Sequence, residues 1–171
     1  MQNYFELFDL ETSFFVDDEA LKKAYQAQVT RFHPDNFATK SQAEQLQALQ
    51  NTSLVNSAYT ALKTPLNRAS YLLNLEDVNP FDEKDTNMEA NFLVSQIELR
   101  EQLEGIKEQQ DNLALDDFIE RIQDFIRDNV ASISEAFTQS RDLQVIKTLV
   151  RELKFYEQLN KEANILIDEW L

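Results

Sequence analysis

The amino-acid sequence predicts an all-α protein, and three observations support this prediction. The 171 residues include only one glycine and three prolines, whereas the helix-favouring residues Leu, Glu, Gln, Ala and Lys are frequent. Apolar residues recur at helical spacing along most of the chain. The longest of these patterns begin at residues suited to a helix start and end at turn-forming residues. A chain of this length can fold as one domain of ordinary size or as two small ones.

The first long helix is expected over residues 18–32, after a short apolar segment at residues 4–8. The acidic residues Asp17, Asp18 and Glu19 suit the positive end of a helix dipole, so they mark its beginning. Apolar residues then follow at spacings of three or four and form one stripe, consisting of Leu21, Tyr25, Val29 and Phe32.

The second long helix should begin near Ser41 and end at Thr64-Pro65. Glu44 lies three residues after Ser41, which is the spacing of a capping box. A short helix over residues 66–75 is expected to follow. The apolar positions of the long helix, through which the two arms of a helical hairpin should pack, are Leu46, Leu49, Leu54, Val55, Ala58, Tyr59 and Leu62.

A turn-forming segment, LEDVNPFDEKDTN at residues 75–87, separates two parts of the chain. Residues 1–75 contain six Lys and Arg against eight Asp and Glu, whereas residues 76–171 contain ten against twenty-three. This difference in charge indicates two parts with different partners. We therefore expect a first domain at residues 1–75, a linker at 76–87 and a second domain at 88–171.

The second part should form an antiparallel three-helix bundle. Three amphipathic patterns, at about residues 88–110, 114–137 and 142–170, are joined by the short connectors QQDN and TQSR. Short connectors between long helices make neighbouring helices antiparallel.

The first helix of this bundle has two apolar faces. Its core stripe is expected to comprise Met88, Phe92, Leu99, Leu103 and Ile106. The third helix has a core-like stripe of Ile146, Leu149, Leu153 and Tyr156, and Phe155 lies well off it. The second apolar face is either covered by the first domain or available to another protein. The hypothetical partner surface consists of Leu93, Val94, Ile97 and Phe155, with Glu98 and Glu101 at its rim.

The composition argues against several classes of protein. Without cysteine and with a single histidine, the chain has no disulfide, no thiolate ligand and no histidine-rich metal site, so we expect no cofactor. The formal charge of −15 disfavours nucleic acid as a partner. No secretory signal or run of 18 apolar residues is present, which predicts a cytoplasmic protein that does not bind membranes.

The only histidine lies in the tripeptide His33-Pro34-Asp35, between the two expected long helices. Pro34 should hold a stiff turn and end the first helix at His33, which would present the His33 and Asp35 side chains at the tip of the hairpin. Alternatively, Pro34 only ends a helix and His33 is an incidental loop residue. The sequence has no serine elbow, glycine-rich phosphate loop or second histidine, so we do not expect an enzyme.

Residues 2–75 resemble a J-domain, the module that binds Hsp70-type chaperones. The likeness rests on the HPD tripeptide, on YFELFDL and LKKAYQAQVTRF before it, and on LVNSAYTALKTPLNRASYLL after it. The resemblance implies that the turn and the preceding helix dock on the chaperone ATPase and accelerate ATP hydrolysis, while the J-protein hydrolyses nothing. The implied chaperone-binding residues are His33, Pro34, Asp35, Lys22, Lys23 and Arg31. The sequence departs from many J-domains at Gln26, Ala27 and Asn36, where basic residues are frequent.

The segments FLVSQIELREQLE and VRELKFYEQL resemble the C-terminal domain of the HscB (Hsc20-type) iron-sulfur co-chaperones. This resemblance implies an L-shaped protein that binds the scaffold IscU and presents it to the specialised Hsp70 HscA. ATP and any iron-sulfur cluster would belong to these partners. The implied scaffold-binding residues are Leu93, Val94, Ile97, Glu98, Glu101 and Phe155. Gly105 is a departure, because an acidic residue can occur there.

Two other functions remain open from the sequence. An acidic helical adaptor with a degenerate J-like domain would bind partners without stimulating an ATPase, because of Gln26, Ala27 and Asn36. A hydrolase that uses His33 and Asp35 would show turnover by the isolated protein.

Overall fold

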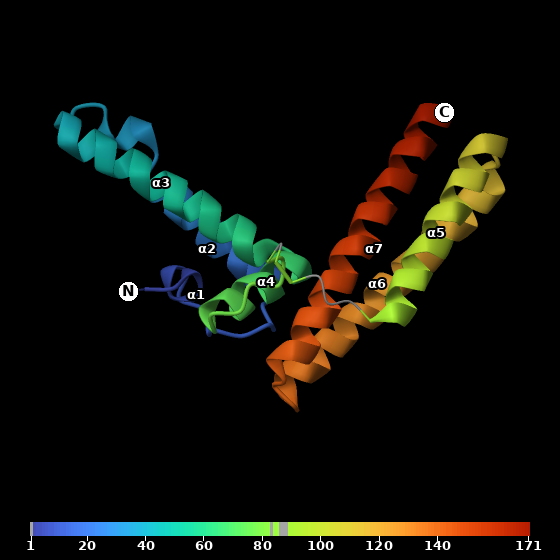
Figure 1. Ribbon diagram of the computed structural model, residues 1–171. Helices are drawn as coiled ribbons and strands as arrows, with labels where there is room; N and C mark the ends of the chain where they lie inside the picture. The colour runs from blue at the N-terminus through green and yellow to red at the C-terminus, as the bar shows by residue number, and fades with distance from the viewer. Residues whose placement is uncertain (1, 83, 86–88) are drawn as a thin grey trace. The chain divides into compact units, whose positions relative to one another are not determined.

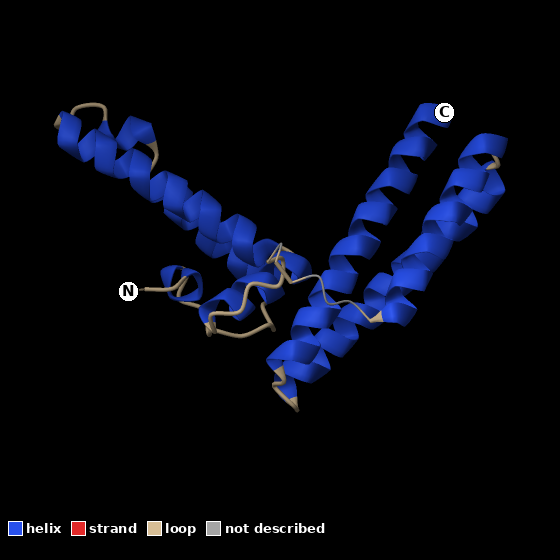
Figure 2. Ribbon diagram, viewed as in Figure 1, coloured by secondary structure: helices blue, strands red, loops and turns tan. Residues whose placement is uncertain are grey.

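The all-α prediction is confirmed by the computed structural model, which describes residues 2–82, 84–85 and 89–171 (Figures 1 and 2). All regular secondary structure within these residues is helical. The chain divides into two compact units, Met1–Leu72 and Leu73–Leu171. The helices are α1 (Tyr4–Leu7), α2 (Asp18–Arg31), the 3-10 helix η1 (Pro34–Phe37), α3 (Gln42–Lys63), α4 (Pro65–Leu75), α5 (Ala90–Gln109), α6 (Asn112–Thr138) and α7 (Leu143–Trp170).

The first unit is built on a hairpin in which α2 and α3 lie side by side (Figure 1). The rings of Tyr25 and Tyr59 stack across the hairpin with centroids 4.0 Å apart, and the Tyr25 hydroxyl donates to Asn56 Oδ1 at 2.7 Å. The side chains buried in this unit include Phe5, Leu21, Val55, Ala58 and Leu62. Burial of these side chains is the main source of stability for the hairpin.

Local capping interactions set the ends of both hairpin helices, largely as predicted. Asp17 caps α2 by accepting hydrogen bonds from the backbone of Glu19 and Ala20. Ser41 and Glu44 form the predicted capping box of α3, with the Glu44 backbone donating to Ser41 Oγ at 3.2 Å. These contacts satisfy backbone donors that have no partner within the helix.

Two predictions for the hairpin are wrong in detail. The helix α2 ends at Arg31, with Phe32 as its C-cap, and not at His33. Leu46 and Leu49 were expected to pack between the arms, but both side chains are exposed, as is Leu54. On α3, Leu46 lies about 180° and Leu49 about 120° from the buried Val55, so no single face can bury all three.

Buried Arg68 holds α4 to the rest of the first unit. Its side chain is 6% exposed and donates from Nε to the Leu62 carbonyl and from Nη1 to the Phe14 carbonyl, both at 3.0 Å. Its Nη2 lies 3.6 Å from the exposed carboxylate of Asp18. Burial lowers the pKa of Arg68, and the charge of Asp18 partly opposes this shift. The guanidinium therefore joins α4, the end of α3 and the segment before α2.

The second unit contains the predicted three-helix bundle of α5, α6 and α7 (Figure 1). Phe92, Leu99 and Leu103 are buried as predicted, Ile106 is partly buried, and Met88 lies outside the described residues. The remaining buried members of this core are Leu115, Phe118, Ile119, Ile122, Phe155, Leu159, Ala163 and Leu166.

Part of the segment before α5 is attached to α7 within the second unit. Asp85 forms ion pairs with Lys147 and Arg151, and the Arg151 side chain also donates to the Asp85 carbonyl at 3.0 Å. The Lys154 ammonium lies 4.3 Å from the centroid of the Phe81 ring. Three basic side chains on one helix thus hold an acidic and an aromatic residue of this segment.

We predict that Arg68→Met destabilises the protein, because it leaves the buried carbonyls of Phe14 and Leu62 without their charged donor. The expected loss in the free energy of unfolding is about 2–4 kcal/mol, measured by urea denaturation. Asp18→Asn is the control, since an exposed ion pair contributes only about 0–1 kcal/mol. Equal effects of the two substitutions would contradict this account of Arg68.

Candidate functional site

The HPD tripeptide forms the turn between α2 and α3, in the conformation that proline imposes. Pro34 is the first residue of η1, and His33 before it is extended, with φ −57° and ψ 135°. His33 Nδ1 accepts a hydrogen bond from the Asp35 backbone N–H at 3.2 Å. A neutral imidazole that accepts at Nδ1 carries its proton on Nε2. The turn thus leaves the His33 Nε2–H available as a donor.

The side chains of the turn are accessible. The side chain of His33 is 53% exposed and that of Asp35 is 92% exposed, with Asp35 Oδ2 lying 3.6 Å from His33 Nδ1. An exposed carboxylate of this kind can accept charge-assisted hydrogen bonds from a basic partner group. The turn therefore presents one donor and one anionic acceptor within a few ångströms of each other.

Hydrogen bonds anchor the turn to both arms of the hairpin. Asn36 Nδ2 donates to the Thr30 carbonyl at 2.8 Å, and the Asn36 backbone donates to the His33 carbonyl at 3.0 Å. Thr52 Oγ1, on α3, donates to the Phe32 carbonyl at 3.3 Å. Asn36, which departs from the basic residue frequent in J-domains, therefore satisfies a carbonyl at the end of α2.

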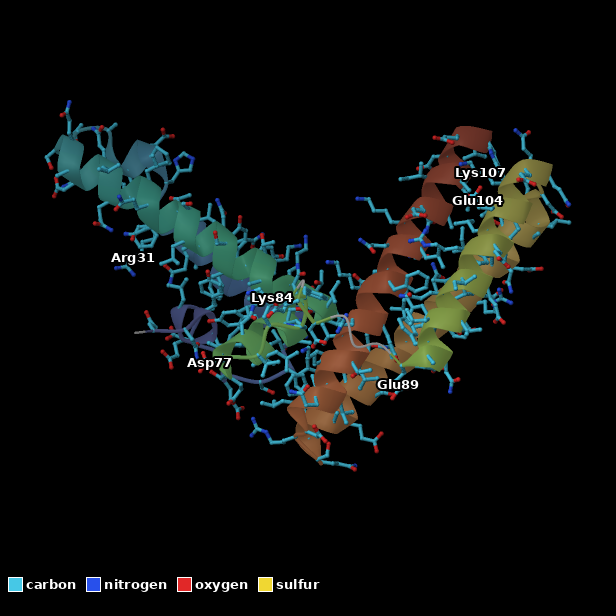
Figure 3. The ribbon with its side chains drawn as sticks, in the orientation of Figure 1. Arg31, Asp77, Lys84, Glu89, Glu104 and Lys107 are labelled. Atoms are coloured by element: carbon cyan, nitrogen blue, oxygen red, sulfur yellow. The ribbon has the colours of Figure 1, made fainter. Side chains whose placement is uncertain are left out.

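The three predicted basic contact residues are all exposed on α2, but they do not form one cluster. Lys22 and Lys23 lie in its second turn, whereas Arg31 is its last residue. Lys22 lies about 180° around the helix from Arg31, and Lys23 about 80°. The Arg31 guanidinium carbon lies 5.2 Å from the centroid of the Phe32 ring, and the side chain extends into solvent (Figure 3).

The second apolar face of α5 is exposed, which is one of the two alternatives that the sequence leaves open. The side chains of Leu93, Val94 and Ile97 are between 43% and 59% exposed. Glu98 and Glu101 are exposed on the same helix. These five residues form one outer face, which combines apolar area with negative charge.

Phe155 does not belong to this outer face, contrary to the prediction. Its ring is only 7% exposed and packs edge-on against Phe92, with centroids 5.8 Å apart. On α7 the buried stripe changes sides along the helix, from Ile146, Val150 and Leu153 to Phe155, Leu159, Ala163 and Leu166. The two stripes lie roughly 150° apart. A helical wheel centred on the first stripe therefore places Phe155 on the side of α7 away from the core.

The side chain of Arg100, on α5, packs against the Phe155 ring. The guanidinium carbon of Arg100 lies 5.4 Å from the ring centroid. Arg100 Nη1 also donates to Glu162 Oε2, on α7, at 3.1 Å. This ion pair was not among the predicted site residues, because Arg100 and Glu162 are 62 residues apart in the sequence.

Both parts of the chain match models of known protein families. The DnaJ domain model matches residues 3–71, and the model described as the HSCB C-terminal oligomerisation domain matches residues 88–164. A "Co-chaperone protein HscB homolog" of Vibrio cholerae is 38% identical over 170 residues, covering 99% of each chain. The chain belongs to the HscB co-chaperone family.

Other members of the HscB family agree with this assignment. The homologue of Vibrio campbellii is 36% identical over 170 residues and covers 99% of each chain. The solved structure of the chaperone HscB from Vibrio cholerae matches with a TM-score of 0.89 and 37% identity, covering 99% of this chain and all of that one. The human co-chaperone protein HscB also matches, with a TM-score of 0.89 and 28% identity, covering 96% of this chain and 82% of that one.

Membership of the HscB family identifies the protein as a J-domain co-chaperone, a class of non-catalytic regulators that act with Hsp70 chaperones. Within the described part of the chain, no group of three or more His, Asp or Glu residues could hold a metal ion. None of the described helices is long and apolar enough to cross a membrane.

A half-buried carboxylate lies next to the aromatic core of the HscB-type bundle. Burial raises the pKa of Glu152, and the charge of Glu89 raises it further. Burial also raises the pKa of Tyr156, to which the charge of Glu152 adds. Ionised Glu152 therefore has an unfavourable environment in the folded bundle.

We predict that Glu152→Gln raises the free energy of unfolding at pH 7. A carboxyl group whose pKa is raised by folding destabilises the native state where it is ionised, and this cost disappears below its unfolded pKa. The gain should therefore shrink as the pH falls toward the usual glutamate value of 4.5. Thermal melting at several pH values measures this, with Glu108→Gln, on the exposed end of α5, as control. A gain that does not depend on pH would contradict the prediction.

Proposed function

We propose that this protein stimulates the ATPase of the specialised Hsp70 chaperone HscA and delivers the iron-sulfur scaffold IscU to it. The observation that carries this proposal is the exposed and anchored HPD turn within a chain of the HscB family. The protein acts in the cytoplasm and binds neither nucleic acid nor membranes. ATP and any cluster are bound by its partners, and this chain hydrolyses nothing.

The HPD turn docks on the chaperone ATPase. Pro34 and the hydrogen bonds of Asn36 hold the turn before binding, so little conformational entropy is lost when the partner binds. His33 donates from Nε2, and Asp35 accepts from a basic group of the chaperone. Stimulation follows because this docking favours the chaperone conformation that hydrolyses ATP.

The basic residues of α2 assist this contact from different sides of the helix. Arg31 is two residues before His33, so it acts beside the turn. Lys22 and Lys23 lie more than two turns away and contribute general electrostatic attraction. This separation fits a chaperone that recognises the turn itself more than a continuous basic surface.

The outer face of α5 binds the scaffold. Leu93, Val94 and Ile97 supply an apolar centre, and Glu98 and Glu101 supply an acidic rim that suits a basic surface. Phe155 is the sixth residue that the family resemblance assigns to this contact. Its ring is buried beneath Arg100, so it takes part only if it is uncovered.

One chain couples the two partners. We place the J-domain at residues 1–75, a linker at 76–87 and the scaffold-binding bundle at 88–171. Holding both partners on one chain raises the effective concentration of the scaffold near the chaperone. The scaffold is thus presented to the chaperone while the HPD turn stimulates ATP hydrolysis.

We predict that His33→Gln reduces stimulation of HscA by about tenfold or more, as expected when a hot-spot residue is lost. Steady-state ATP hydrolysis by HscA, with this protein, IscU or both added, measures the effect. Thr39→Ala, at an exposed position just after η1, is the control. Stimulation that persists in His33→Gln would show that the HPD turn is not needed for it. If the folded wild-type protein does not stimulate HscA, the protein is an adaptor that binds its partners without activating the ATPase.

We predict that the double variant Leu93→Ala/Ile97→Ala binds IscU more weakly by about 2–4 kcal/mol, because two apolar anchors are removed. Isothermal titration calorimetry measures the affinity. The melting temperature should change little, since both side chains are exposed. Leu113→Ala removes an equally apolar side chain that is 79% exposed on α6, and it serves as control. Unchanged IscU binding in the double variant would place the scaffold elsewhere.

A further inference from the structure

We propose that Arg100 and Glu162 form a movable cover over Phe155, and that the Phe155 ring contacts the scaffold protein only when this cover opens. This inference rests on the proposed scaffold-binding function. It concerns a site between α5 and α7, both of which lie in the second compact unit.

The closed cover is defined by two contacts. The Arg100 guanidinium carbon lies 5.4 Å from the centroid of the Phe155 ring, which is a cation–π distance. Arg100 Nη1 donates to Glu162 Oε2 at 3.1 Å. The ion pair therefore fixes the guanidinium in the position that covers the ring, which is only 7% exposed.

The cover can move at little cost, although the ring beneath it belongs to the core. The side chains of Arg100 and Glu162 are 49% and 50% exposed. Ion pairs with this exposure contribute little to stability, because water solvates both charges when they separate. A partner that offers apolar area to the ring can therefore displace the guanidinium.

The cover also lies at the end of the apolar stripe of the outer face. Leu93, Ile97 and Arg100 follow each other at spacings of four and three residues, which places them on one side of α5. Opening the cover would continue the apolar surface from Leu93 and Ile97 across to Phe155 on α7. An apolar part of the scaffold protein that binds the α5 face would then also contact the Phe155 ring.

The open position has a replacement partner for the displaced guanidinium. Glu104 is exposed on α5, four residues after Arg100 (Figure 3). Side chains at this spacing are neighbours on a helix surface and can form an ion pair. Arg100 thus has one carboxylate on α7 that holds it closed and another on its own helix that can hold it open.

The test compares two variants that remove the same charge. Glu162→Gln removes the partner of the closed position and should strengthen binding of the scaffold protein by about two- to fivefold, since exposed ion pairs have energies of this order. Glu104→Gln removes the partner of the open position and should leave the affinity unchanged or lower it. Calorimetric titration of the full-length variants with the purified scaffold protein measures both. Equal changes in the two variants would reflect lost charge alone and would overturn the cover.

A second measurement tests whether Phe155 is the group that is covered. Phe155→Leu keeps an apolar side chain in the core, and the strengthening by Glu162→Gln should vanish in this background. Strengthening that persists without the Phe155 ring would overturn the proposal. If Phe155→Leu does not fold, as judged by thermal melting, the comparison of Glu162→Gln with Glu104→Gln still tests whether the cover exists.

The tests can refute the cover without refuting the proposed scaffold-binding function. If Leu93→Ala/Ile97→Ala weakens scaffold binding but Glu162→Gln does not strengthen it, the cover is refuted and the binding face remains. If the apolar double variant has no effect on scaffold binding, the scaffold does not use this face, and the cover is refuted with it.

Discussion

Pro34 and Pro65 break the helical chain on either side of α3, and the position of the HPD turn depends on the first of these breaks. With a single glycine and few other breakers, the sequence would favour helix nearly throughout. Pro34 separates α2 from α3 and creates the HPD turn, and Pro65 begins α4 immediately after α3 ends. Pro80 lies in the segment between α4 and α5. Each proline lacks a backbone donor and restricts the residue before it, so a continuous helix cannot pass through.

Hydrogen bonds from polar side chains hold the turns between the helices in place. Asn36 returns a hydrogen bond to the last turn of α2, and Thr52 joins α3 to the same region. At the other end of the first unit, Arg68 satisfies two buried carbonyls. Buried or terminal carbonyls are costly to leave without donors, so these few contacts restrict the turns much as apolar packing restricts the helices.

The bundle separates stability from binding by using different faces of α5. Phe92, Leu99 and Leu103 belong to the core, whereas Leu93, Val94 and Ile97 remain exposed on the outer face. A helix that is apolar on two sides loses solubility unless charged residues surround the second side. Glu98 and Glu101 provide this charge, and Arg100 lies among them with its charge directed toward α7.

The sequence by itself determined the helical class, the helix limits to within a few residues, the acidic start of α2, the capping box at Ser41 and the two apolar faces of α5. These features depend on residues a few positions apart, so local spacing and propensity are sufficient to predict them. The HPD motif and the family resemblance likewise rest on short segments.

Only the tertiary structure decided which apolar side chains are buried and which distant polar groups meet. Burial of Phe155 against Phe92 and the contact of Arg68 with Phe14 join groups more than 50 residues apart in the sequence, and the exposure of Leu46 depends on how α3 pairs with α2. The Arg100–Glu162 pair is a contact of the same kind. A single helical wheel assumes one buried face, whereas α7 changes its buried face along its length, because side-chain burial is set by the neighbouring helices and not by the helix itself.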